Sequence, residues 1–160
     1  MKNDMIKIKP FRQTSGFCGP ASLKMVFDYY GVSVPEAQIA KAAGATRKKG
    51  VTLKGLVKAA EKFGFKAFFK EKCSLGDIGR FVKRGVPVIV DWFSEDEGHY
   101  SVVTGIDGKN IILMDPELKG ERKIPLKKFF RIWFDFSGDY IKDCKEMVLR
   151  AILVVIPKNI

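Results

Sequence analysis

Apolar residues in the first half of the chain recur every three or four positions, which is the spacing of amphipathic helices. The first such segment ends at Gly31, a residue type that commonly follows a helix C-terminus. The later segments are preceded by residues suited to helix starts: Ser33, with Pro35 just inside the first turn, Thr52 and Ser74. The pattern predicts helices over residues 18–30, 33–43, 52–64 and 74–85.

The second half of the chain contains apolar runs of strand length. Residues 86–93 predict a buried strand, and residues 99–106 and 110–115 flank an Asp-Gly pair that is typical of a hairpin. Residues 147–156 predict the last strand, and residues 127–134 form an aromatic-rich segment compatible with a helix. Because helices precede strands, we expect an α+β fold in which N-terminal helices pack on a mostly antiparallel sheet.

Composition adds limits on organisation and partners. A chain of 160 residues with 46% apolar residues suits one domain, and we expect it to span residues 1–160. The sequence has no stretch of about 18 apolar residues, so it predicts no membrane span, and its N-terminus has no apolar signal segment. The three cysteines then fit reduced thiols in the cytoplasm. One histidine and widely separated cysteines give no metal-binding pattern, so we expect neither a metal nor an organic cofactor.

The net charge of +11 leaves nucleic-acid binding as a hypothesis, but not a favoured one. The basic residues are scattered, and no basic run exceeds three residues. No aromatic RNA-binding motif or zinc pattern accompanies them. A lysine-rich surface is the simpler interpretation, and we expect no specific nucleic-acid partner.

Cys18 is the first candidate for chemistry because it lies where a loop becomes a helix. The free N–H groups and the dipole of a helix N-terminus favour a thiolate. Gly19 lets a substrate approach the backbone, and Pro20 is tolerated in a first helical turn. A buried structural thiol is the alternative, because free cysteine is among the most buried residue types. We interpret Cys73 and Cys144 in this second way.

The relative position of His99 and Asp115 depends on the turn between their strands. A two-residue turn over residues 107–108 would place the two side chains on opposite faces of the hairpin. A three-residue turn over residues 106–108, with Gly108 in the left-handed conformation, would place His99 directly across from Asp115. Directly opposed residues have Cβ atoms about 4.5–5.5 Å apart, so the carboxylate could orient the imidazole and stabilise its charged form. We predict the three-residue turn.

Other polar and aromatic residues lie near these candidates in the sequence. The side-chain amide of Gln13 could donate to an oxyanion together with the backbone N–H of Cys18, although it could equally be a polar loop residue. The acidic loop over residues 95–97 could favour the imidazolium or select basic substrates, but a solvated loop is the simpler interpretation. Trp92 precedes this loop and is a candidate for lining a cleft.

Four elements in order resemble the C39 cysteine peptidases and C39-like proteins. They are Gln13, the segment C-G-P-A-S-L-K-M-V at residues 18–26, the segment G-H-Y-S-V-V-T-G at residues 98–105, and Asp115 followed by proline. The resemblance covers residues 11–156 and implies a papain-like fold. It also implies that Cys18 is the nucleophile, His99 the base and then the acid, Asp115 the group that orients His99, and Gln13 part of the oxyanion hole.

The best-known family members remove leader peptides, usually after a double glycine, and are fused to ABC exporters. The resemblance therefore implies a peptide or protein substrate and leaves room for a separate transporter partner. The chain ends at Ile160, so we do not expect the exporter-linked, double-glycine specificity to apply. Many members have six residues between the glutamine and cysteine positions, whereas here the offset is five.

Two further functions stay open at the level of sequence. The same thiol and imidazole can pass an acyl group to an amine or a thiol, which would make the protein an acyltransferase. A binding module that keeps the fold without activity is the other alternative. Peptide hydrolysis remains the first prediction because each expected catalytic residue type is present.

Overall fold

The computed structural model describes residues 5–159, so the outermost ends of the predicted domain, residues 1–4 and 160, lie outside the described residues. The helices are α1 (Cys18–Tyr29), α2 (Glu36–Ala43), α3 (Leu53–Lys62), α4 (Leu75–Lys83), α5 (Leu126–Ile132) and the short 3-10 helix η1 (Cys144–Glu146). The strands are β1 (Phe65–Lys70), β2 (Val88–Ser94), β3 (Glu97–Ile106), β4 (Asn110–Asp115), β5 (Gly120–Pro125), β6 (Phe134–Asp135), β7 (Val148–Leu149) and β8 (Ile152–Pro157). In the described part of the chain, no helix has both the length and the apolar content needed to cross a bilayer.

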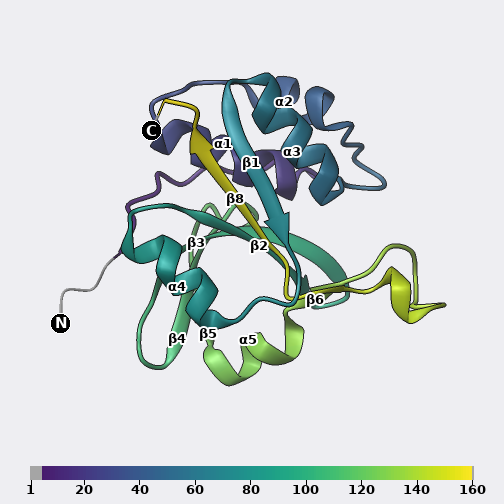
Figure 1. Cartoon of the computed structure of the whole chain (residues 1–160). Helices are drawn as coiled ribbons and strands as arrows, with labels where there is room; N and C mark the ends of the chain where they lie inside the picture. The colour runs from purple at the N-terminus through teal and green to yellow at the C-terminus, as the bar shows by residue number, and fades with distance from the viewer. Residues whose placement is uncertain (1–4, 160) are drawn as a thin grey trace.

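Six strands form one antiparallel sheet in the order β1-β8-β2-β3-β4-β5. The helices α1, α2 and α3 lie together on one side of this sheet, and α4 and α5 lie on the other (Figure 1). The alternation along β1 reflects this arrangement, because Phe65 stacks on Phe27 of α1 whereas Phe68 contacts Phe81 of α4. The expected α+β class, with helices packed on an antiparallel sheet, is confirmed.

The N-terminal caps explain most of the helix boundaries. The hydroxyl of Thr52 accepts a hydrogen bond from the Gly55 backbone at 3.1 Å, and Ser74 caps α4, so both predicted caps are confirmed. Asp77 completes a capping box with Ser74, which was not predicted. The predicted cap at Ser33 is wrong. Pro35 occupies the N-cap position of α2, so Ser33 lies two residues too early for its hydroxyl to reach the first turn.

Two strands of the large sheet were not predicted. The strand β1 lies between α3 and α4, and β5 follows β4 after a short turn. Both are edge strands, and their exposed residues interrupt the apolar runs that identified the central strands. The simple order of helices followed by strands is therefore wrong in detail, although the class is right.

Helix α1 is the most deeply buried helix. Its side chains Leu23, Met25, Val26 and Phe27 are at most 1% exposed, and the Phe27 ring stacks on Phe65 with centroids 4.4 Å apart. The Ser22 hydroxyl donates to the carbonyl of Tyr100 in β3 at 3.2 Å, which ties the helix to the strand that carries His99. The N-terminus of α1 is thus held in a fixed position against β3.

Candidate active site

Cys18 is the first residue of α1 and is partly exposed. No side chain caps this helix, so the first backbone N–H groups of α1 are not occupied by a capping side chain. A Cβ on Gly19 would collide with Val51, which gives this glycine a role in helix packing in addition to any approach of substrate. The arrangement offers a thiol at the positive end of a rigid helix.

His99 and Asp115 lie on the same face of the β3–β4 hairpin, but not for the predicted reason. The predicted three-residue turn is wrong, because Ile106 pairs with Ile111 and Gly108 is not in the left-handed conformation. The register instead shifts between residues 103 and 105, so Thr104 is an extra residue in β3. This bulge restores the common face, and His99 lies diagonally across from Asp115.

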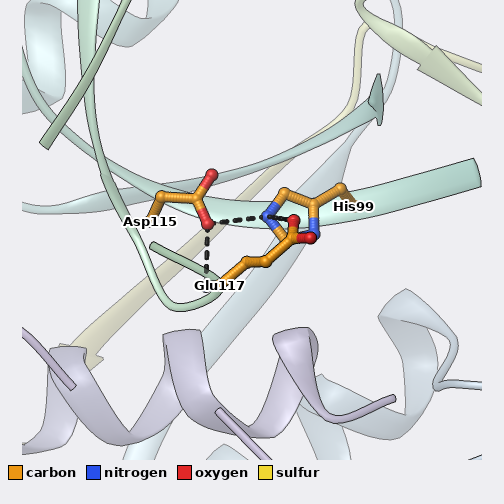
Figure 2. Close-up of side chains that lie close together, drawn as sticks. All are labelled: His99, Asp115 and Glu117. Atoms are coloured by element: carbon orange, nitrogen blue, oxygen red, sulfur yellow. Dashed lines mark hydrogen bonds and ion pairs between the residues drawn. The ribbon is translucent and has the colours of Figure 1, made fainter. Parts of the chain in front are cut away.

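The two side chains form a direct hydrogen bond. Figure 2 shows the Asp115 carboxylate facing the His99 ring. The Nε2 atom of His99 is 2.9 Å from Oδ1 of Asp115, and the residues are 3% and 0% exposed. The other ring nitrogen, Nδ1, is free of this contact. The hydrogen bond fixes which edge of the imidazole faces Asp115 and which edge remains for a reacting group.

Asp115 accepts hydrogen bonds from several directions. Its Oδ1 also accepts from the Glu117 backbone at 2.8 Å, and its Oδ2 accepts from Nε of Arg122 at 2.8 Å and from the Ser101 hydroxyl at 3.4 Å. Burial raises the pKa of Asp115, but the hydrogen bonds and the charge of His99 outweigh that effect and lower the pKa to about 2. The carboxylate is therefore ionised and fixed throughout the neutral range.

The pKa of His99 moves in the opposite direction. Burial lowers it, but the hydrogen bonds and charges of Asp115 and Cys18 outweigh burial and raise the pKa of His99 to about 10. Cys18 is therefore close enough to His99 to interact with its charged form. At neutral pH the site holds an imidazolium between a carboxylate and a thiol, which is the arrangement that activates a sulfur nucleophile.

Trp92, Ser101 and Arg122 enclose the Asp115 side of the site. The Trp92 ring meets His99 edge-on at 5.4 Å, and its Nε1 donates to the Ser101 hydroxyl at 3.1 Å. The Arg122 guanidinium lies 5.5 Å from the Trp92 ring. Trp92 is 2% exposed, so it packs behind the imidazole and does not line an open cleft. Arg122 could not be identified from sequence because its strand, β5, was not predicted.

Arg122 provides a first test of these contacts. In Arg122→Met, Asp115 loses a charged hydrogen bond and its pKa rises from about 2. The stability that the carboxylate supplies is present above its unfolded pKa of about 3.9 and is lost as the pH falls through the folded value. We expect acid unfolding to begin at a higher pH and the free energy of unfolding at neutral pH to fall by about 1.5–3 kcal/mol.

Circular dichroism during acid titration would measure this shift. Arg122→Lys keeps a positive charge and should restore part of the loss. Arg131→Met removes an exposed arginine in α5 and serves as the matched control. An unchanged acid midpoint in Arg122→Met would contradict the assigned role.

Gln13 lies next to the turn that follows Asp115. Its backbone N–H donates to the carbonyl of Pro116 at 2.9 Å, and its Nε2 is 3.5 Å from the Thr14 carbonyl. Its Oε1 is buried without a hydrogen-bond partner. The structure thus brings the N-terminal segment alongside the Asp115 loop, while the role of the amide toward an oxyanion remains a prediction.

The ligand atoms of His99, Asp115 and Glu117 lie within 4.8 Å of one another (Figure 2). His99 Nε2 is 3.9 Å from the Glu117 carboxylate, which belongs to a side chain that is 55% exposed. Two features of the group disfavour a cation. The same Nε2 already bonds to Asp115, and the Arg122 guanidinium holds the second oxygen of Asp115. These donors fit a hydrogen-bonded imidazolium better than a metal ion.

The other two cysteines differ from each other. Cys73 is 1% exposed, its Sγ contacts the Lys70 carbonyl at 3.3 Å, and burial raises the pKa of its thiol. Cys144 is exposed in η1, so its interpretation as a packing residue is wrong. The described thiols therefore span three environments: Cys18 beside an imidazolium, Cys73 in the core and Cys144 in solvent.

Comparison with known proteins gives consistent matches. The profile of the Peptidase C39 family matches residues 9–137. An uncharacterized protein of Methanothermobacter marburgensis is 38% identical over 135 residues, which are 81% of this chain and 84% of that protein. The transport/processing ATP-binding protein ComA of Streptococcus pneumoniae is 37% identical over 120 residues, which are 72% of this chain but 16% of that protein.

A solved structure extends the match to the fold. It is a double glycine motif protease from an AMS/PCAT transporter in complex with the leader peptide, with a TM-score of 0.73 and 26% identity. The alignment covers 96% of this chain and 94% of that one. The papain-like α+β fold that the resemblance implied is thereby confirmed.

Proposed function

Because the chain belongs to the peptidase C39 family, we propose that it is a cysteine peptidase that hydrolyses peptide bonds through Cys18, His99 and Asp115. The observation that carries this proposal is the buried His99–Asp115 hydrogen bond of 2.9 Å, with Cys18 close enough to raise the pKa of the same imidazole. We further propose that residues 1–160 form a single C39-like domain.

The mechanism follows from the protonation states. The Cys18 thiolate attacks the carbonyl carbon of the scissile bond, and the oxyanion is stabilised by the Cys18 backbone N–H and the Gln13 amide. The imidazolium of His99 gives its proton to the leaving amine, so the C–N bond breaks and a thioester remains. Neutral His99 then takes a proton from water, and the hydroxide attacks the thioester carbonyl. The C–S bond breaks, the acid product leaves, and the Cys18 thiolate and the His99 imidazolium are restored. Asp115 keeps the imidazole oriented throughout.

Leader peptides are the substrate class that the matches favour. The similar protease was solved in complex with a leader peptide, and ComA is a transport/processing protein. The match covers only 16% of the length of ComA, so we propose the processing activity alone for these residues, with a transporter as a partner. The free thiols suit a reducing compartment, and we place the activity in the cytoplasm.

Alkylation of the native protein across a pH series tests the site directly. Each cysteine is followed separately by peptide mass spectrometry. We expect Cys18 to react below pH 7, because the His99 imidazolium favours its thiolate. Exposed Cys144 should react more slowly than Cys18 below pH 7, and buried Cys73 should react last. In His99→Ala, Cys18 should behave like Cys144.

Activity is then measured on leader-like peptides with and without a Gly-Gly pair. Added amines would reveal acyl transfer as a new amide product, which would replace hydrolysis by the acyltransferase alternative. If Cys18 reacts no faster than Cys144 below pH 7, the site holds no thiolate–imidazolium pair. The peptidase proposal would then give way to a peptide-binding module.

A further inference from the structure

Two carboxyl groups that the proposed mechanism does not use lie near the His99 end of β3. Asp91 belongs to β2 and is 2% exposed, and its carboxyl group lies close to that of Asp135 in β6. Asp135 Oδ1 accepts from the Phe136 backbone at 2.7 Å. The Oδ1 atom of Asp91 is buried without a hydrogen-bond partner. Asp91 and Asp135 therefore form a buried contact between two acids.

Among the described residues, the groups that act most strongly on the Asp91 carboxyl are themselves acids. Asp135 comes from β6, Cys18 from α1, Tyr100 from the paired position of β3, and Glu71 from the segment after β1. Each of these is an acid. Two carboxyl groups at hydrogen-bonding distance in a buried site do not both ionise, and one retains a proton that the other accepts. Burial and the neighbouring acids raise the pKa of Asp91 well above its ordinary value, which makes Asp91 the donor.

Asp135 lies in close contact with Gly98, the residue before His99. A Cβ on Gly98 would collide with the carboxylate of Asp135, so β6 lies directly against the backbone before His99. The Phe93 ring stacks on Phe134 and on Phe136, each at 5.2 Å, on the two sides of Asp135 in sequence. β6 is therefore docked on the β2–β3 hairpin by two stacked rings and by the close approach of the Asp135 carboxyl group to Gly98.

We infer that Asp91 and Asp135 share a single proton that fastens β6 against Gly98, and that the two carboxyls are positioning residues for the His99 end of the site. Their importance for cleavage rests on the proposed function, whereas the proton-dependent contact does not require catalysis. Loss of the proton places two negative charges together in a buried space. Asp135, which is nearer the surface, then moves away and takes β6 with it.

The direction of the pH effect follows from linkage. The folded protein binds the shared proton more tightly than the unfolded chain, because burial raises the pKa of both carboxyls. The contact is fully present at low pH and weakens as the pH rises through the folded pKa of the pair. This trend is opposite to that of Asp115, whose contribution disappears at low pH.

Amide hydrogen exchange of the whole protein over a pH series tests the inference. After correction for the intrinsic pH dependence of exchange, protection of residues 134–149 should fall by about tenfold for each pH unit above the point of proton loss. Asp91→Asn keeps an N–H donor for Asp135 but cannot ionise, so its protection should be independent of pH. Asp139→Asn removes an exposed carboxyl beyond β6 and is the matched control, with wild-type behaviour expected.

A second variant protects the test against a folding failure. Asp135→Asn keeps an amide oxygen as acceptor and removes the second negative charge, so it should also make the protection of β6 independent of pH. Wild-type protection that does not change with pH, or asparagine variants that follow the wild-type curve, would overturn the inference. Hydrogen exchange needs no substrate, so these results remain interpretable if the protein proves not to cleave peptides.

Discussion

Cys18→Ala should abolish peptide cleavage, with a loss on the order of 10⁴-fold or more, because nucleophilic catalysis has no substitute route when the attacking atom is absent. The thiol lies at a partly exposed helix start, so the fold should persist with a similar thermal midpoint. Product formation from a leader-like peptide, followed by mass spectrometry, measures the loss. Calorimetry on the same sample separates it from unfolding.

The exposed thiol in η1 supplies the matched control. Cys144→Ser also removes a thiol, but from an exposed position in η1, and this variant should cleave at the wild-type rate. Cys18→Ser tests the chemistry further, because a hydroxyl beside the same imidazolium is a much weaker nucleophile at neutral pH. Cleavage that survives in Cys18→Ala would exclude the thioester mechanism.

Asp115→Asn should give the second large effect, a loss of about 10²–10⁴-fold in cleavage, because the imidazole loses the carboxylate that orients it. The amide can still accept one hydrogen bond, but it presents a donor to a pocket already filled by donors from His99, Arg122 and the Glu117 backbone. The pKa of His99 should fall from about 10, since Asp115 supplies a hydrogen bond and a charge that raise it.

The pH profile distinguishes this role from a general loss of stability. A histidine whose folded pKa is raised stabilises the protein fully below its unfolded pKa of 6.5, and this contribution disappears as the pH rises through about 10. In Asp115→Asn the pKa of His99 is lower, so the imidazolium that cleavage requires is lost at a lower pH. The alkaline limit of cleavage should therefore move to lower pH. Glu117→Gln is the control, because its exposed carboxylate is 3.9 Å from His99 and should matter little. An alkaline limit that does not move in Asp115→Asn would refute the orienting role.

The helix starts and central strands could be predicted because their signals are local. Thr52 and Ser74 cap helices through their own side chains, and the buried strand β2 appears in the sequence as a run of apolar residues. The cap at Ser33 failed because a proline can begin a helix without a side-chain hydrogen bond. The edge strands β1 and β5 were missed because half of their residues face solvent.

The sequence predicted only those site residues whose reactive side chains lie within a recognisable local motif. Cys18, His99 and Asp115 have distinctive neighbours in the sequence, and the structure brings His99 to Asp115 and Cys18. Arg122 and Asp135 have no such signal, because each acquires its partner through pairing or docking of an unpredicted strand. Asp91 lies inside an apolar strand, where nothing local indicates a partner.

The bulge at Thr104 makes the β3–β4 hairpin sensitive to length in one place and tolerant in another. One residue gained or lost between His99 and Thr104 would turn the histidine to the opposite face, because side chains alternate along a strand. The tip at residues 107–110 carries no such constraint, provided that the pairing of Ile106 with Ile111 survives. During divergence, insertions and deletions should therefore accumulate at the tip, while the count of residues from the histidine to the bulge stays fixed or changes by two. The number of residues from His99 to the bulge therefore identifies related sequences in which the histidine faces the wrong side of the sheet, even though every residue of the motif is present.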